Sequence, residues 1–371
     1  MLAILIFSAL MTCLAGLGLL RLGLFTRSYS QDAPQRFHSG DIPRLGGVGV
    51  LLGLVAAVSF TALSQHMQWT HHFNARLPWL LKVLACTLPV FLAGLAEDWT
   101  HRLGIRWRFL GALTSAILAC WLLDLRVARL DVPVIDMAMH WGWFSLGFTL
   151  LAVAGLPNAF NIIDGYNGLA GMVAVLLASA IAYIALLNGD RELATLAVAV
   201  VGSSLGFLFW NYPRGVLFAG DCGAYLWGVM LAILAIALVQ RHASVSPWFA
   251  MLLFSYPVSE TLFSVYRKWI RGQPASMADS MHFHQLVYKR IVRGVFHDDE
   301  TRQMLTRNNR TSPYMWAMCA LTVLPAVLFW NKTLVLILFC CLFMVTYVGA
   351  YLMIVRFQVP RWIAPKHSDF K

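Results

Sequence analysis

The sequence predicts an all-α, polytopic integral membrane protein with about eleven transmembrane helices. Its mean hydropathy is +0.68, and 12% of its residues are charged, whereas an ordinary soluble domain carries about 25%. Apolar runs of about 20 residues, the length that crosses a bilayer, recur from one end of the chain to the other. We therefore expect residues 1–371 to form a single integral membrane domain without a separate soluble domain.

Eleven runs fit this description in chain order. They lie at roughly 1–24, 45–64, 78–96, 107–125, 141–157, 168–187, 192–210, 219–239, 246–267, 313–330 and 333–355. The first run has no Lys or Arg before Arg21, so it lacks the basic start of a signal peptide. We expect it to be a retained helix.

The basic residues are distributed unevenly between alternate connections. Of the 28 Lys and Arg residues, 20 fall in the segments 26–44, 97–108, 158–168, 211–220, 266–312 and 356–371, and seven fall on the opposite side. Cytoplasmic loops carry such an excess, so the asymmetry predicts a periplasmic N-terminus and a cytoplasmic C-terminus. It also accounts for the net charge of +11 without a nucleic-acid partner. The segment 266–312, predicted as a long basic cytoplasmic loop, holds nine of these residues.

Four acids stand at predicted cytoplasmic helix ends, each flanked by apolar sequence: Glu97, Asp98, Asp164 and Asp221. An Asp at mid-bilayer costs about 3 kcal/mol on insertion scales, so acids near membrane depth tend to be functional. These four come from three separate connections that share one depth and one side. Carboxylates that converge in this way predict a divalent cation.

Each acid also has a structural explanation, and the sequence leaves these alternatives open. The Glu-Asp pair could form ion pairs with Arg102 or Arg106. Asp164 could lie in an ordinary turn that caps the next helix. Asp221 could be the N-cap of the long apolar helix that follows it.

Polar residues around two of the acids suit ligand binding. Asp164 lies in the stretch NAFNIIDGYNGLAG, where Asn161 adds an amide and the glycines allow a ligand to approach the backbone closely. Asp221 lies in FAGDCG, three residues after the aromatic ring of Phe218. Both stretches therefore suit a wall of a binding site better than a simple connection.

Two further stretches carry groups that suit phosphate. His282 and His284 alternate within 266–312, where they could bind phosphate when protonated, ligate a metal or lie on the surface. Arg36 and Arg44 flank a Pro turn and a Gly pair that precede the second predicted helix. A Gly-rich turn with arginines is typical of phosphate sites, although Gly pairs also start ordinary helices.

Five of these segments lie on one predicted face in a fixed order: IPRLGG, GLAEDW, NAFNIIDGYNGLAG, NYPRGVLFAGDCGA and MHFHQL. Over residues 36–290 this order resembles the polyprenyl-phosphate N-acetylaminosugar-1-phosphate transferases. The resemblance implies transfer of a sugar-1-phosphate, a HexNAc-1-phosphate, from a UDP-N-acetylaminosugar to undecaprenyl phosphate with release of UMP. It further implies Mg2+ or Mn2+ as cofactor, a cytoplasmic-facing site in the bacterial inner membrane, and the initiating step of a surface polysaccharide.

The resemblance also implies a role for each matching residue. In catalysis, Glu97 and Asp98 match a pair thought to orient or deprotonate the lipid phosphate, and Asp164 matches a catalytic-site Asp. Asp221 matches the metal ligand. The implied substrate contacts are Phe218 stacked on uracil, Asn211 on the nucleotide, Asn161 beside Asp164, His282 and His284 on the diphosphate, and Arg44 on phosphate. Arg36 is a further phosphate candidate.

The chain departs from the family pattern at three positions. Glu97 stands where the family has the first Asp of an Asp-Asp pair, which keeps the charge and lengthens the arm. Asn167 replaces the second Asp of DGxDG, and Gln285 replaces the third His of HxHH. We interpret these changes as those of a sub-branch that acts on aminosugars other than the muramoyl-pentapeptide.

The mechanism expected from the sequence is direct attack of a lipid phosphate oxygen on the β-phosphorus, in line with departing UMP. Asp98 is the first choice for the base. A covalent intermediate on Asp98 or Asp164 is the alternative, and the sequence does not separate the two. It also leaves open which sugar is used and whether the protein forms a homodimer.

Two other functional classes compete with the transferase. A cation-coupled transporter would use acids at mid-bilayer, and Glu260 is the one acid placed to serve it. An inactive scaffold of the same fold would tolerate loss of Asp221. The clustering of acids at helix ends and the absence of a sequence repeat favour the transferase.

Overall fold

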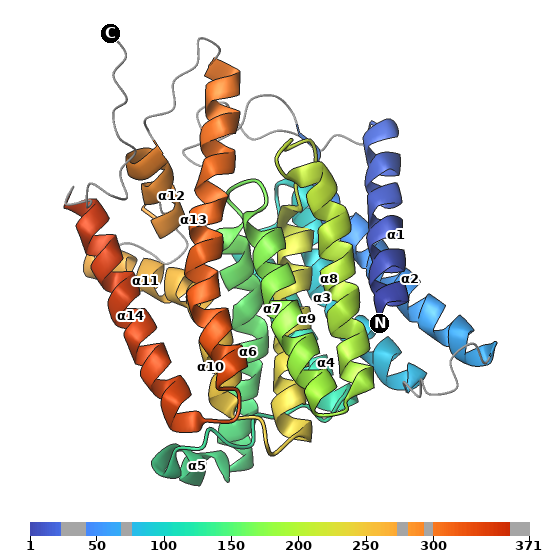
Figure 1. Ribbon diagram of the computed structural model, residues 1–371, viewed down its shortest axis with the longest axis vertical. Helices are drawn as coiled ribbons and strands as arrows, with labels where there is room; N and C mark the ends of the chain where they lie inside the picture. Colours follow the sequence, from blue (N-terminus) through green and yellow to red (C-terminus); the bar gives the residue numbers. More distant parts are fainter. Residues whose placement is uncertain (24–41, 68–75, 273–280, 293–299, 357–371) are drawn as a thin grey trace.

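The computed structural model describes residues 1–23, 42–67, 76–272, 281–292 and 300–356, and this part of the chain is helical (Figure 1). The helices are α1 Leu2–Arg21, α2 Gly46–His66, α3 Leu77–Thr100, α4 Ile105–Leu122, α5 Pro133–Met139, α6 Gly142–Ile163, α7 Leu169–Leu187, α8 Arg191–Asn211, α9 Gly220–Arg241, α10 Pro247–Leu253, α11 Ser255–Ile270, α12 Phe283–Leu286, the π-helix η1 Val287–Ile291, α13 Glu300–Leu328 and α14 Thr333–Val355. Ten of them are long and apolar enough to cross a membrane. The prediction of an all-α, polytopic membrane protein is confirmed.

The prediction of one helix over 246–267 is wrong. That run is divided at Phe254 into the short helix α10 and the helix α11, and α11 lies across the direction of the neighbouring long helices (Figure 1). α10 starts near α14, where Ser246 bonds Thr333. α11 reaches the opposite end of the bundle, where Glu260 contacts His284. The two helices together therefore carry the chain from one end to the other, in addition to the ten candidate spans.

The polar stretch after residue 157 is more helical than the sequence suggests. α6 continues through Pro157 to Ile163, so the first part of NAFNIIDGYNGLAG is helix and the turn begins at Asp164. Pro157 packs against α9, because a Cβ placed on Gly228 would lie 2.4 Å from the Pro157 Cα atom. The glycine therefore lets α9 approach the proline-containing part of α6 closely.

The segment 266–312 is also largely structured where it is described. It contains the end of α11, the helices α12 and η1, and the start of α13, which begins at Glu300 rather than near residue 313. α5 was not predicted from the sequence either. Both differences arise where short polar or mixed segments pack on the long helices, which hydropathy alone does not detect.

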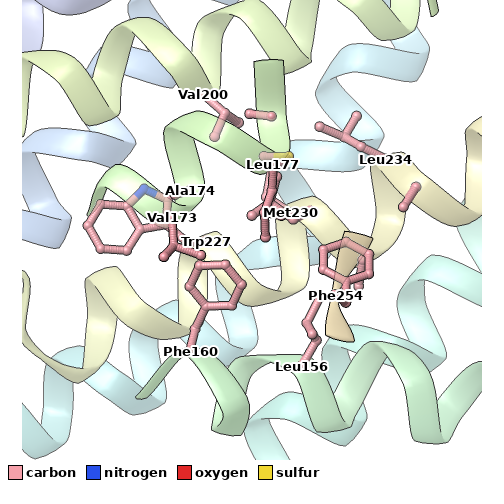
Figure 2. Packing of buried hydrophobic residues seen from close by; sticks show 14 of the residues in the cluster. Leu156, Phe160, Val173, Ala174, Leu177, Val200, Trp227, Met230, Leu234 and Phe254 are labelled. Atoms are coloured by element: carbon pink, nitrogen blue, oxygen red, sulfur yellow. The ribbon is translucent and has the colours of Figure 1, made fainter. Parts of the chain in front are cut away.

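The core is organised around α9, which is buried along almost its whole length. Figure 2 shows its side chains Trp227, Met230 and Leu234 packed among residues from α6, α7 and α8. The indole nitrogen of Trp227 donates to the hydroxyl of Ser204 on α8 at 2.9 Å, so the one polar atom of this large side chain is satisfied. The middle of α9 is therefore fixed by its neighbours.

α1 begins and α14 finishes at opposite ends of the bundle. α1 runs parallel to α8, since Ser8 donates to Ala199 and Trp210 donates to Cys13. The N-terminus consequently lies at the end where α8 begins. α14 finishes at the other end, where Arg290 donates to the carbonyl of Val355. We call the end where α9 begins and α14 finishes the site end, and the other the far end.

Candidate functional site

Asp98 joins the end of α3 to the start of α9. Its Oδ1 accepts from the backbone N–H of Asp221 and its Oδ2 from that of Cys222, both at 2.9 Å. Gly220 adopts a positive φ of 73°, and a Cβ there would lie 2.5 Å from Asp98 Oδ2. Only glycine lets the backbone turn this closely onto the carboxylate. Asp98 is buried, and it satisfies N–H groups that the first turn of α9 leaves unpaired.

Glycines let α9 approach its neighbours at this point. A Cβ on Gly94 of α3 would lie 2.6 Å from both the Cα and the N atom of Cys222. A Cβ on Gly47 of α2 would lie 2.3 Å from the N atom of Gly223. Since the opposing atoms are backbone, neither position has room for a side chain.

Asp221 is the acid on which the surrounding elements converge. Its Oδ2 accepts from Arg108 Nη1 on α4 at 2.6 Å, and its Oδ1 accepts from Asn161 Nδ2 on α6 at 2.8 Å. The N-cap explanation is wrong, because the carboxylate points to these side chains and Ala219 is the N-cap residue of α9. Asp221, like Asp98, is buried.

Arg108 was not identified from the sequence. It forms the ion pair with Asp221, whereas the arginines expected to pair with acids were Arg102 and Arg106. It lies one turn inside α4, so that its side chain can reach α9 across the α3–α4 connection. The basic cluster RWR at the start of an apolar helix is a signal that could have pointed to it.

Glu97, next to Asp98, faces a different part of the structure. Its Oε2 accepts from the backbone N–H of Leu103 at 2.8 Å, which closes the turn between α3 and α4. The longer side chain of Glu, compared with the Asp of the family, therefore serves this contact with Leu103. The Glu-Asp pair is split between the turn and the start of α9.

Asp164 caps the C-terminus of α6, where it is only partly buried, unlike Asp98 and Asp221. Burial raises the pKa of Asp164 to about 7; the nearby charge of Arg44 opposes this shift, and those of Asp221 and Asp98 add to it. The negative charges of Asp221 and Asp98 therefore act on Asp164, and Arg44 offsets them only in part. Such an environment suits a bound cation.

The turn after Asp164 is held by side chains from two other helices. Asn211 of α8 accepts from the backbone N–H of Gly168 at 2.5 Å and donates to Leu217 at 2.8 Å. The amide of Asn167 donates to Asn309 of α13 at 3.0 Å. Asn167 therefore links the turn to α13. The Asp that the family has at this position could not donate this hydrogen bond.

The segment before α2 pairs with the segment before α9. Phe218 donates its N–H to Pro43, and its carbonyl accepts from Gly46 at 2.8 Å. This places Arg44 and the partly buried Phe218 at the same junction as Asp221. The other arginine predicted to contact phosphate, Arg36, lies outside the described residues.

The two motif histidines stack against each other, with ring centroids 5.2 Å apart and planes at 5°. His284 reaches the Asp164 turn, since a Cβ on Gly165 would lie 3.3 Å from His284 Nε2. Gln285 turns inward, and its Oε1 accepts from the backbone N–H of His282 at 3.2 Å. The third position of the motif therefore stabilises the short helix α12.

The acidic side chains of the site suit a cation that takes most of its ligands from substrate and water and few from the protein. Within the described part of the chain, no group of three or more His, Cys, Asp or Glu side chains is arranged to hold a metal ion. Mg2+ is commonly held by one or two carboxylates together with substrate phosphates and water. Asp221 suits such a cation because its partners are the side chains of Arg108 and Asn161, which can rotate away, whereas those of Asp98 are backbone N–H groups. Asp164 is the more open of the nearby acids.

Residues 80–239 match the family described as glycosyl transferase family 4. The part of the chain from α3 to α9 is therefore similar in sequence to this family. The match to family 4 covers the acids, Arg108, Asn161, Asn211 and Phe218, whereas Arg44 and both motif histidines lie outside it.

Individual relatives extend beyond this region. The chain is 27% identical over 265 residues, 71% of its length and 70% of the relative's, to a probable undecaprenyl-phosphate N-acetylglucosaminyl 1-phosphate transferase of Bacillus subtilis (strain 168). It is 33% identical over 237 residues to a phospho-N-acetylmuramoyl-pentapeptide-transferase of Rhodopseudomonas palustris (strain BisB18), and 31% identical over 224 residues to the protein of that name from Bartonella quintana (strain Toulouse). These two alignments cover 56% of this chain and 62% of each relative.

Proposed function

We propose that this protein is a member of glycosyl transferase family 4 that transfers a HexNAc-1-phosphate from a UDP-N-acetylaminosugar to undecaprenyl phosphate and releases UMP. The observation that carries the proposal is the convergence of Asp98, Asn161 and Arg108 on the start of α9 at Asp221. The printed name of the Bacillus subtilis relative favours GlcNAc as the sugar. Such a product would initiate a bacterial surface polysaccharide.

We place the site at the cytoplasmic face of the bacterial inner membrane. Trp99 and Trp107, 59% and 64% exposed, lie on α3 and α4 near the acids, and Trp121 and Trp143, 77% and 87% exposed, lie at the far end. Exposed tryptophans are typical of the two membrane–water interfaces. A site at one interface can meet a soluble nucleotide-sugar and a lipid phosphate together, and the basic excess on the site end favours the cytoplasm.

The chain's own residues position and neutralise the reacting phosphates, which is what phosphoryl transfer mainly requires. Arg108 and Arg44 supply fixed positive charge, and His282 and His284 add donors. Mg2+ held through Asp221, with Asp164 beside it, would neutralise charge on the diphosphate and the leaving UMP. The lipid phosphate attacks the β-phosphorus directly.

The geometry favours Asp164 over Asp98 as the group that orients or deprotonates the lipid phosphate. Both oxygens of Asp98 are engaged by backbone N–H groups, and the side chain is buried. Asp164 is only partly buried, so its carboxylate is the more accessible of the two to a lipid phosphate. A phosphate monoester is already largely ionised at pH 7, its second pKa being about 6, so orientation matters more than proton removal.

The function is tested by UMP release from UDP-GlcNAc with undecaprenyl phosphate, using the purified protein in detergent. We expect release that stops on addition of EDTA and returns with excess Mg2+. A panel of other UDP-aminosugars identifies the sugar. Absence of UMP release with every sugar, in protein that elutes as a single species, would contradict the proposal and favour an inactive scaffold.

Phe218→Ala is expected to raise the KM for the UDP-sugar with little change in kcat. Stacking of a base on an aromatic ring contributes about 1–3 kcal/mol, so the rise should be roughly 5- to 150-fold. Phe218→Tyr keeps the ring and should keep the KM. An equal rise in KM in both variants would show that the side chain at position 218 matters for packing and not for stacking on uracil.

A further inference from the structure

Glu260 is the most completely buried acid near the site, and nothing in the proposed reaction uses it. Its side chain on α11 is 0% exposed. A carboxylate in such a position requires hydrogen-bonding partners or a proton. The partners that surround it come from the segment that carries the motif histidines.

Four groups of that segment meet the Glu260 carboxylate. The backbone N–H of Phe283 lies 3.2 Å from Oε2, and that of His284 lies 3.3 Å from Oε1. The ring atom Nδ1 of His284 lies 3.2 Å from Oε1, and that of His282 lies 3.6 Å from Oε2. Glu260 therefore holds the backbone of α12 and the ring of His284 by hydrogen bonds, whereas the His282 ring lies beyond hydrogen-bond distance.

The contact determines which nitrogen of His284 carries a proton. An ionised carboxylate only accepts hydrogen bonds, so Nδ1 must donate and bears the hydrogen. The other nitrogen, Nε2, is then the atom that faces the turn at Gly165, next to Asp164. Tyr166 packs edge-on against the same ring, with centroids 5.6 Å apart, and limits its rotation.

We propose that Glu260 is a positioning residue of the transferase site: it aims His284 Nε2 at the Asp164–Gly165 turn and stabilises the imidazolium that forms when a substrate diphosphate binds. The proposal rests on the proposed function. His284 takes up one proton from solvent at Nε2, and the resulting N–H donates to a phosphate oxygen. Without Glu260 the bound diphosphate would be the one opposite charge beside the buried imidazolium.

The charged and titratable groups around Glu260 and His284 are consistent with this positioning role. Burial holds the pKa of His284 below its ordinary value, Glu260 opposes that shift, and the charges of His282 and Arg267 reinforce it. The other titratable groups that face the pair are Tyr166 on the Asp164 turn, Tyr256 on α11 and Tyr347 on α14. Among these groups, Glu260 is the one that favours the charged form of His284.

The sign of the pH effect follows from this balance. A step that needs the imidazolium becomes less efficient as the pH rises above the pKa of His284. Removing the Glu260 charge lowers that pKa further, so the loss begins at a lower pH. A nearby opposite charge shifts a pKa by about one unit or more, so the change should be measurable.

The test is the pH dependence of kcat and KM for UMP release by the full-length protein with Glu260→Gln. We expect kcat/KM at pH 7.5 to fall roughly 10- to 100-fold, the usual cost of removing the partner that orients a functional histidine. The loss should lie mainly in the KM for the UDP-sugar and should be relieved at lower pH. Glu260→Asp, which keeps the charge, should keep the wild-type pH profile.

Glu192→Gln is the matched control. Glu192 is a buried acid at the far end, where it pairs with Arg241 at 3.0 Å. Its loss should lower thermal stability without changing KM or the pH profile. A Glu260→Gln protein with the same pattern as this control would overturn the proposal, because Glu260 would then be purely structural.

His284→Gln keeps the test decisive if Glu260→Gln does not fold. It removes the proton without removing Glu260, so the decline of kcat/KM with rising pH should disappear. A decline that survives in His284→Gln would overturn the proposal. Lack of UMP release by the wild-type protein would instead refute the proposed function itself.

Discussion

Asp221→Asn is expected to lower kcat for UMP release by about three orders of magnitude, equivalent to roughly 4 kcal/mol of transition-state stabilisation. The carboxylate receives Arg108 and Asn161 and is the proposed cation ligand. Asparagine keeps the shape but loses the charge. The measurement is kcat with saturating UDP-sugar, together with the Mg2+ concentration that gives half-maximal activity.

Asp136→Asn is a suitable control for this experiment. Asp136 accepts from the backbone N–H of Leu130 at 2.6 Å at the far end, so it tests the same chemical change away from the site. It should retain near wild-type activity. An Asp221→Asn protein with unchanged kcat would exclude the assigned cation site and favour the scaffold interpretation.

Gly94→Ala is expected to reduce both stability and activity, because the added methyl group would push α3 away from the start of α9. The Cβ would meet the backbone of Cys222 at 2.6 Å, and backbone cannot yield as a side-chain tip can. Overpacking of this kind costs about 1–3 kcal/mol. The same displacement would separate Asp98 from the N–H groups that it holds. Thermal unfolding in detergent and UMP release measure the two effects.

Gly155→Ala provides the comparison. Gly155 lies within α6, and a Cβ there would meet nothing within 4 Å. Alanine is more favourable than glycine inside a helix by about 1 kcal/mol, so this variant should be as stable as the wild type or more so. Equal destabilisation of the two variants would contradict the close approach of α3 and α9 as the cause.

The contrast between Glu97 and Asp98 shows how far adjacent residues can differ in role. The sequence presents them as one pair of acids. In the fold, Asp98 accepts from the first turn of α9 and Glu97 accepts from Leu103. Adjacent side chains on a helix point about 100° apart, so Asp98 can face the start of α9 while Glu97 faces the turn between α3 and α4.

The sequence by itself determined the membrane class, most of the long helices and the identity of the acids. Hydrophobic length is a local property, so it is visible in one stretch of chain. Acids at helix ends are equally visible, because a charge near the bilayer is rare. The break at Phe254 and the extension of α6 to Ile163 were not visible, since both depend on packing against neighbouring helices.

Only the tertiary structure decided which groups meet. Arg108 and Asp221 are 113 positions apart in the chain, and Glu260 and His284 are 24 apart, so no local pattern links them. The pairing of Arg108 with Asp221 follows from close approaches of backbone at Gly94 and Gly47, which fix where α9 begins. The charge of a buried side chain indicates that it needs a partner. Helix packing selects that partner, because packing decides which groups come within hydrogen-bond distance.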